Sequence, residues 1–509
     1  MAVQLLDDVI SMPKLAVLWT DMFIWGAFIV ALLYAWHARR NTALRNAWSS
    51  VLRTPSAAAS GVILAAFVLV GLLDSIHYRP VLPPLNPDEQ TETRYEPIAR
   101  SVLDDVLEHT GLAKVERTYS APLALNLFFK ESQIIDGEAV RDYPPLEHAA
   151  IGIESSQQRN KDIVQRLGYA IVAMVVWVAL SWALWNALAR RHARAKGNPV
   201  SWAEARQLWW AADSELAAWK ATWYALTALV LCASVIMALS GNYYVLGTDR
   251  SGNDVIALSL KSVRTALVIG TLTTFAMLPP ALGFGIAAGY FKGWVDDIIQ
   301  YIYTTLTSIP GVLLIAACVL LMQVYIDNHP ELFDTVAARA DLRLFLLCLI
   351  LGLTGWSGLC RLLRAETLKL RELEYVQAAR AFGVGHFRIM LKHILPNLMH
   401  IILITMVLEF SGLVLYEAVL SYLGIGVDPS MPSFGTMIDA ARVEMSRDPM
   451  IWWNLGAAFV FLLALVLSAN IFADAVQRAF DPRARRLHIV VPRTRKQAAA
   501  LSKRQGESL

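Results

Sequence analysis

The sequence predicts an all-α polytopic membrane protein, and three observations support this fold class. Of the 509 residues, 56% are apolar and only 17% are charged, whereas about a quarter of the residues in an average soluble domain are charged. The mean hydropathy is +0.45. Apolar runs of about 20 residues, the length of helix that crosses a bilayer, recur along the chain. Soluble enzyme classes are therefore excluded, and no nucleic-acid partner is expected.

Nine apolar runs are long enough to form spans, because only a helix satisfies its own backbone groups where water is absent. A cleaved signal peptide is the alternative for the first run. No small-residue cleavage site is evident there, so we expect a retained span. The predicted spans are 16–36, 57–75, 165–187, 222–240, 262–290, 295–323, 342–358, 399–420 and 452–474.

The orientation of the spans follows from Lys and Arg, which stay on the cytoplasmic side during insertion. Segment 359–398 holds seven basic residues, and the chain from 476 onward holds nine. Segment 76–164 instead holds nine basic and fifteen acidic residues, a net charge of −6. Nine alternating spans with an external N-terminus and a cytoplasmic C-terminus place each of these segments on the side that its charge favours.

Spans and loops together divide the chain into six predicted segments. A helix is expected at 97–111 in the external part, which is either an acidic cap or a docking surface for a partner. A capping box from Ser201 to Glu204 predicts an interfacial cytoplasmic helix. The segments are 1–56 (an extra span and a basic linker), 57–75 (a span), 76–164 (an external inserted domain), 165–221 (a span and the interfacial helix), 222–475 (the main transmembrane domain) and 476–509 (a basic cytoplasmic tail).

The loop 359–398 is too polar to cross a membrane and contains the strongest functional signal. Strong helix formers precede Gly383 and Gly385, and a second short segment ends at Pro396. This pattern predicts a helix, a glycine turn and a second short helix stopped by the proline. Small Ala378 and Ala379 permit close approach by another backbone, so the loop suits insertion into a groove on a cytosolic partner.

These residues resemble a known family. Gln377, Ala378 and Ala379, followed by Gly383 and then by Leu395 and Pro396, are similar to the EAA loop of the permease subunits of ABC importers. In that family the loop docks on the ATPase, which implies a coupling role here for the segment from Glu374 onward. Gln377 stands where the family favours Glu, so a neutral hydrogen bond is expected in place of a charge contact.

Further motifs resemble the peptide/nickel branch of the family, and in particular its C-type subunit. The stretch 246–255, with Gly247, Asp249, Gly252 and Asp254, resembles an external motif of that branch, with Asn253 in place of the usual Arg. The resemblance extends over about 240–486. Residues near 50–80 resemble the family's N-terminal span. The other matching stretches are 288–296, 421–427, 432–435 and 481–483.

The resemblance implies a type I permease core of about six spans, to which this chain adds N-terminal spans and an inserted external domain. It implies a bacterial inner-membrane importer for peptides or similar small solutes, built from this subunit, a B-type permease, two cytosolic ATPases and an external solute-binding protein. ATP and magnesium would be bound by the ATPases, because this sequence contains no G-x-x-x-x-G-K-[ST] phosphate loop. The chain itself is expected to have no catalytic role and no cofactor.

Several residues within the apolar runs are further candidates. Glu409 lies near the middle of a span, where a charge costs about 3 kcal/mol, so it is expected to line the pathway, to contact a partner subunit or to be a structural carboxyl. Pro279 and Pro280 should kink or locally unwind their span. Gly285 and Gly289 have the spacing of close helix packing. No metal site is predicted.

The alternative function is a self-contained secondary transporter. It would use Glu409 and Asp474 as proton or ion sites and would need no ATPase. A secondary transporter has no need for a docking loop at 359–398, so this loop separates the two hypotheses. A membrane enzyme is disfavoured because no convergent catalytic set is found on either face.

Overall fold

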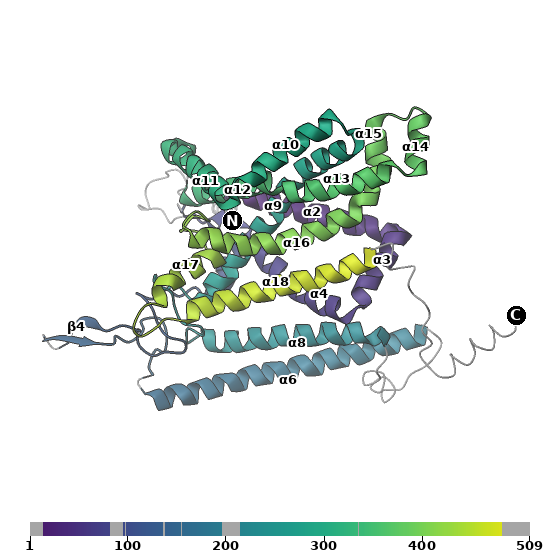
Figure 1. The fold of residues 1–509 in the computed structure, drawn as a ribbon. Coiled ribbons are helices and arrows are strands. Elements are labelled where there is room, and N and C mark those ends of the chain that lie inside the picture. Colours follow the sequence, from purple (N-terminus) through teal and green to yellow (C-terminus); the bar gives the residue numbers. More distant parts are fainter. Residues whose placement is uncertain are drawn as a thin grey trace, which may run out of the picture.

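The computed structural model describes residues 14–81, 95–96, 98–135, 138–153, 155–195, 214–333 and 335–480. It confirms the predicted all-α membrane architecture: long helices run side by side, with the β4 hairpin at one end of the molecule and α14 and α15 at the other (Figure 1). The predicted interfacial helix after Ser201 and the matching stretch 481–483 lie outside the described residues.

Among the described residues, six helices begin before residue 255, and one of them, α5, is short and lies in the inserted segment 76–164. α6 packs along α8, and α8 packs along α4. The predicted spans at 57–75, 165–187 and 222–240 fall within α4, α6 and α8 respectively. The bounds are α2 Trp19–Arg40, α3 Thr42–Arg53, α4 Pro55–Asp74, α5 Val102–His109, α6 Ser156–Ala195 and α8 Ser214–Ser240.

The main domain is built around α9, which packs against α4, α12, α13 and α16. Its elements are α9 Val255–Phe291, α10 Trp294–Ser308, α11 Gly311–Asn328, the 3-10 turn η1 Pro330–Leu332, α12 Val336–Gly355, α13 Ser357–Arg371, α14 Glu374–Ala381, α15 His386–Ile389, the π-helical segment η2 Met390–Ile394, α16 Leu395–Tyr422, α17 Phe434–Glu444 and α18 Trp453–Phe480.

Eight helices of the described chain are long and apolar enough to cross a membrane, against nine predicted spans. The predicted span 295–323 is wrong as a single helix, because the chain breaks between α10 and α11 at Ile309 and Pro310. The predicted span 342–358 forms most of α12. This helix is not among the eight, because it contains three charged residues, Arg339, Asp341 and Arg343.

In the part of the chain that the structure describes, short strands form two small sheets. β1 Lys14–Leu15 pairs with β2 His77–Arg79, which pairs with β3 Arg100–Ser101. β4 Glu131–Ile135 and β5 Glu138–Asp142 form an antiparallel hairpin.

The helix expected at 97–111 is shorter than predicted and spans only α5. Ser101 and Asp104 form a capping box at its start. The residues before this cap therefore pair as strand β3 and do not extend the helix.

The two prolines of α9 do not unwind it, which corrects the expected local unwinding. The helix is continuous through Pro279 and Pro280. Gly285 and Gly289 lie against α13, as their spacing predicts. A Cβ atom at Gly289 would come within 2.8 Å of the Arg364 carbonyl oxygen. This close packing against α13 holds the helix next to the prolines in place.

A buried polar cluster holds the extra N-terminal helix α2 against the main domain. The guanidinium of Arg264 in α9 lies 2.5 Å from Asp21 and 3.3 Å from Asp341 of α12. The Thr20 backbone N–H also donates to Asp341 (3.0 Å), and His77 contacts Asp21 at 2.8 Å. Because a buried charge is costly without a partner, this cluster fixes where α2 docks.

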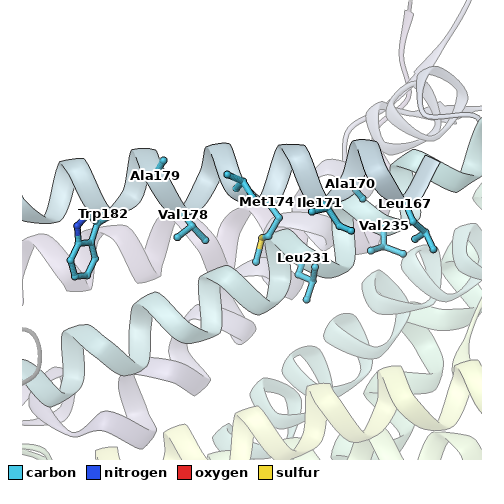
Figure 2. A pocket seen from close by; sticks show the side chains of 10 residues that line it. Leu167, Ala170, Ile171, Met174, Val178, Ala179, Trp182, Leu231 and Val235 are labelled. Carbon is cyan, nitrogen blue, oxygen red and sulfur yellow. The ribbon is translucent and has the colours of Figure 1, made fainter. Parts of the chain in front are cut away.

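An apolar groove of about 550 Å³ lies between α6 and α8 (Figure 2). Its lining includes Leu167, Met174, Trp182, Leu231 and Val235. All of these residues belong to helices that are long enough to span a bilayer. The groove therefore faces the hydrocarbon layer and contributes no polar chemistry.

Candidate functional site

The predicted coupling loop forms a helical hairpin at the end of the molecule opposite β4 (Figure 1). α14 ends in a Schellman motif: the Gly383 N–H donates to the Arg380 carbonyl (3.1 Å), and the Val384 N–H donates to the Ala379 carbonyl (3.1 Å). Gly383 has φ +75°, and a Cβ atom there would meet nothing within 4 Å. Glycine is therefore favoured at position 383 by the backbone conformation and not by a lack of space for a side chain.

The second half of the loop is not stopped by Pro396, which corrects the prediction. α15 continues through the π-helical η2 into α16, and Leu395 and Pro396 form the first turn of that helix. Proline is tolerated in a first turn, and single π-helical turns occur within α-helices. The hairpin is thus continuous with the long helix α16.

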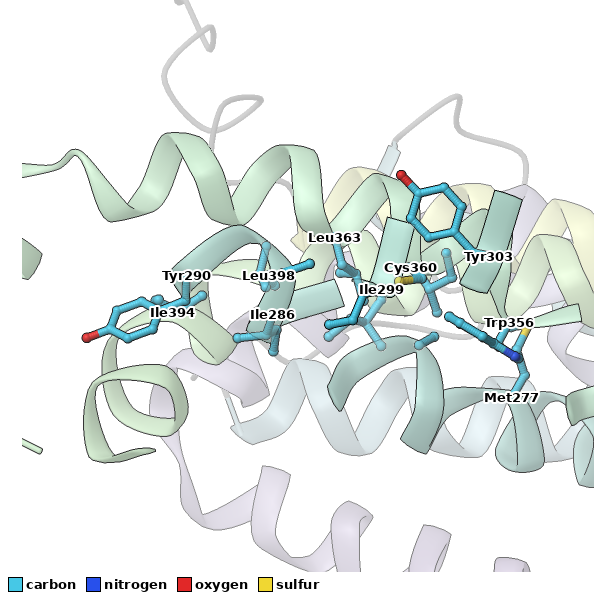
Figure 3. Packing of buried hydrophobic residues seen from close by; sticks show 14 of the residues in the cluster. Met277, Ile286, Tyr290, Ile299, Tyr303, Trp356, Cys360, Leu363, Ile394 and Leu398 are labelled. Carbon is cyan, nitrogen blue, oxygen red and sulfur yellow. The ribbon is translucent and has the colours of Figure 1, made fainter. Parts of the chain in front are cut away.

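One face of the hairpin is anchored in a buried apolar cluster. Val376, Ile389 and Ile394 pack with side chains of α9, α10 and α13. Figure 3 shows Ile394 and Leu398 beside Ile286 of α9. A displacement of the hairpin is therefore transmitted directly to these helices, because close-packed interiors deform little.

Two aromatic side chains of the hairpin are exposed. Phe382 at the turn is 87% exposed and Phe387 is 72% exposed. Exposed aromatic side chains at a protruding turn are typical of a surface that a partner covers. Neither residue was predicted from the sequence as part of the docking surface, although each lies within four residues of Gly383.

Gln377 forms a hydrogen bond within the loop itself. Its Nε2 donates to the Glu372 backbone carbonyl at 3.2 Å. Glu372 in turn accepts from Lys292 at 2.9 Å, and this contact lowers the pKa of its carboxyl. Ala378 is exposed, whereas Ala379 is half-buried against the apolar cluster.

Polar contacts that the sequence did not reveal connect the base of the hairpin to α9 and α10. Arg364 binds Asp296 through two nitrogens, at 2.5 and 2.8 Å. Arg371 donates to the Tyr290 carbonyl at 2.6 Å, and the Tyr290 hydroxyl lies 2.9 Å from His386 Nδ1. A two-point arginine–carboxylate pair fixes relative orientation as well as distance.

The external motif at 246–255 is covered by the inserted segment. A Cβ atom at Gly252 would lie 1.8 Å from the Glu116 carbonyl oxygen, and one at Gly247 would lie 2.4 Å from the Ser120 carbonyl oxygen. The Glu116 N–H donates to the Gly252 carbonyl at 2.9 Å. These glycines therefore permit backbone contact between the inserted segment and the main domain.

The two aspartates of this motif stabilise its backbone. Asp249 accepts from the Ser251 and Asn253 N–H groups, both at 2.8 Å. Asp254 caps α9 by accepting from the Ile256 N–H at 2.7 Å. Burial raises the pKa of Asp254 to about 7.

Glu409 and Glu417 of α16 have different surroundings. Glu409 is half-buried, and no hydrogen bond or ion pair to it is found in the part of the chain that the structure describes. Glu417 is buried and accepts from Ser421 at 2.7 Å and from Ser433 at 3.0 Å. Glu417 thus connects α16 to the start of α17, whereas Glu409 stays available to a group outside this chain.

Comparison with known proteins identifies the family. Residues 281–486 match the family described as binding-protein-dependent transport system inner membrane component. The oligopeptide transport system permease protein OppC of Haemophilus influenzae is 30% identical over 243 residues, which are 48% of this chain and 71% of that protein. The chain belongs to this family. It is a C-type permease of the peptide branch of ABC importers.

Other relatives of the permease cover similar shares of both chains. OppC of Mycobacterium tuberculosis strain H37Rv is 31% identical over 48% of this chain and 78% of that protein. The dipeptide permease DppC of Bacillus subtilis is 30% identical over 47% and 69%. A solved structure of the MetNI methionine ABC transporter aligns with 44% of this chain and 95% of that chain, with a TM-score of 0.34 and 17% identity.

Proposed function

We propose that this permease forms half of the translocation pathway of an ATP-driven importer for peptides or similar small solutes, and that it receives the work of ATP hydrolysis through the α14–α15 hairpin. Membership of a family of ABC permeases supports the transport role. The hairpin geometry supports the coupling role, because one face is anchored in the core while Phe382 and Phe387 protrude.

The mechanism follows from the two faces of the hairpin. Cytosolic ATPases that close around ATP and magnesium would press on the exposed face. The buried face would move α9, α13 and α16, since Val376, Ile389 and Ile394 are packed among them. Rigid movement of packed helices is a general way to open a pathway on one side and close it on the other.

The complex that fits this mechanism contains a B-type permease, two cytosolic ATPases and an external solute-binding protein. The hairpin would lie in the cytoplasm and the β4 hairpin outside, with an external N-terminus and a cytoplasmic C-terminus in the inner membrane. In this arrangement Glu409 would face the pathway or the B-type subunit, or serve as a structural carboxyl. Membership of the ABC permease family disfavours the secondary transporter that would use Glu409 and Asp474 for ions.

The test is ATP-driven uptake by the assembled complex carrying Phe382→Ala. We expect uptake to fall by about tenfold or more, because a truncated aromatic residue at the centre of an interface commonly costs 2 kcal/mol or more. Ile151→Ala is the matched control, since Ile151 is 77% exposed at the external end. Normal uptake with Phe382→Ala, or an equal loss with the control, would refute coupling through this face.

A further inference from the structure

A polar cavity of about 590 Å³ lies where the inserted segment meets the main domain. One wall is Asp104 and Lys114 of the inserted segment. The external motif and the start of α9 form a second wall, and the segment that contains α17 forms a third. Three separate parts of the chain therefore enclose a volume large enough for a small solute.

Two buried acceptor atoms of residues that line this cavity have no partner in the described structure. They are Oδ2 of Asp254 and Oδ1 of Asn454. Asp254 is 2% exposed and Asn454 is 1% exposed. The Asn454 amide donates to Glu444, which is also buried and also lines the cavity. Such acceptors are costly to leave unpaired, so this wall favours a ligand that donates hydrogen bonds, as an ammonium group does.

A second cavity of about 420 Å³ adjoins the first and is richer in arginine. The two share Arg250, Pro429, Thr436 and Ala440. Arg343, Arg442 and Arg447 also line the second cavity, where Asp439 is the acidic residue. Nε of Arg343 is buried and has no partner in the described structure, whereas its Nη1 donates to Asp428 at 3.2 Å. This wall favours an anionic group such as a carboxylate.

We propose that the two adjoining cavities form a binding site for a short zwitterionic peptide on the external side of the permease, with the amino end beside Asp254, Glu444 and Asn454 and the carboxyl end beside Arg250 and Arg343. The inference rests on the proposed role in peptide import. It assigns to the inserted segment a part in the site, because Asp104 and Lys114 form one of its walls. Such a site would receive the solute between its release by a binding protein and its entry into the membrane.

The test is binding of trialanine to the full chain in lipid nanodiscs, measured by calorimetry. Arg250→Gln is the main variant, because Arg250 is exposed and its loss leaves no buried group unpaired. We expect trialanine affinity to fall on the order of tenfold, the usual effect of losing one charge-assisted hydrogen bond. Arg141→Gln in the exposed β5 strand is the matched control and should bind as the unmodified chain does.

Blocked peptides separate the two ends of the site. N-acetyl-trialanine should lose affinity because it lacks the ammonium, and trialanine amide should lose affinity because it lacks the carboxylate. Asp254→Asn, which keeps the helix-capping oxygen, should reduce trialanine affinity but leave binding of N-acetyl-trialanine unchanged. Equal binding of all three peptides, displacement of trialanine by inorganic phosphate alone, or no difference between Arg250→Gln and Arg141→Gln would overturn the proposal.

A failure of this proposal is distinguishable from a failure of the proposed transport function. If uptake depends on Phe382 but trialanine does not bind to the chain, the external site is refuted and the coupling role stands. If trialanine binds as described but uptake is indifferent to Phe382, the external site stands and the coupling role is refuted.

Discussion

At the scale of single residues, the positive φ of Gly383 decides the geometry of the coupling hairpin. Open space around its Cα shows that the chain itself would accommodate a side chain. A docked partner would not. Strain in the turn and obstruction of the partner are therefore two separate effects of a substitution at Gly383, and a suitable pair of variants separates them.

Gly383→Asn and Gly383→Val should both lose ATP-driven uptake if the turn enters a groove. Asn tolerates a positive φ, whereas a β-branched residue does not. The Asn variant should thus keep the thermal stability of the chain, and the Val variant should lower it. Uptake and thermal unfolding of both proteins provide the measurement. Full uptake by the Asn variant would show that backbone conformation alone is required there.

Asp254 should make the stability of the chain depend on pH. Burial raises its pKa from 3.8 to about 7, so the folded chain keeps a proton that the unfolded chain releases near pH 4. The resulting stabilisation is present below about pH 4 and is lost as the pH rises through 7. Asp254→Asn should flatten the decline in thermal midpoint between pH 5 and pH 8. An identical pH profile for both proteins would contradict this assignment.

The sequence predicted the glycine turn of the hairpin, because helix formers followed by Gly383 and Gly385 indicate a helix end. It did not predict the partners of Gln377 or Arg364. Gln377 donates to the carbonyl of Glu372, whose carboxylate accepts from Lys292 on another segment, and Arg364 binds Asp296 of α10. Local pattern carries no information about which distant carboxylate or amine completes a pair.

At the scale of elements, the contact between α9 and α13 depends on two small residues, Gly285 and Gly289. A Cβ atom at Gly289 would lie 2.6 Å from Thr367 Cβ, whereas one at Gly283 in the same helix meets nothing within 4 Å. The two positions therefore form a matched pair for measuring how close packing supports the site.

Gly289→Ala should destabilise the chain by about 1–3 kcal/mol through overpacking of this contact. Gly283→Ala should be neutral or slightly stabilising, because alanine favours the helix and fits the open space. Thermal unfolding in the same detergent compares the two. Equal midpoints for both variants would mean that α13 can move away from α9 without cost.

Most helices were predictable because each needs about 20 apolar residues to cross the membrane. The exceptions have local causes. Pro310 divides one predicted span into α10 and α11. In α12 the charged side chains find partners, as Asp341 does with Arg264 and Arg343 with Asp428. Hydropathy averages cannot show that a charge is paired.

At the scale of the whole molecule, the added parts are joined to the family core by buried polar contacts. α2 is held through Asp21 and Arg264, and the inserted segment is held through Glu116 and Gly252. The sequence left open whether the inserted segment is a cap or a docking surface. Its backbone contacts with the external motif show that it packs against the main domain.

In the proposed function, the ATPases act at one end of the helix bundle and the solute enters at the other. The hairpin of α14 and α15 lies toward one end of the long helices and α17 toward the other (Figure 1), and residues of α17 line both cavities. α9 and α16 extend between these regions, so both regions act on the same two helices.

Coupling of the ATPases to the α14–α15 hairpin is tested most directly by site-specific photo-crosslinking in the assembled transporter. A photoreactive amino acid replaces Phe382 in the test protein and Ile151 in the control. We expect a crosslink from position 382 to an ATPase subunit and none from position 151. A crosslink from position 382 to an external protein, or none to the ATPase in a complex that transports normally, would contradict it.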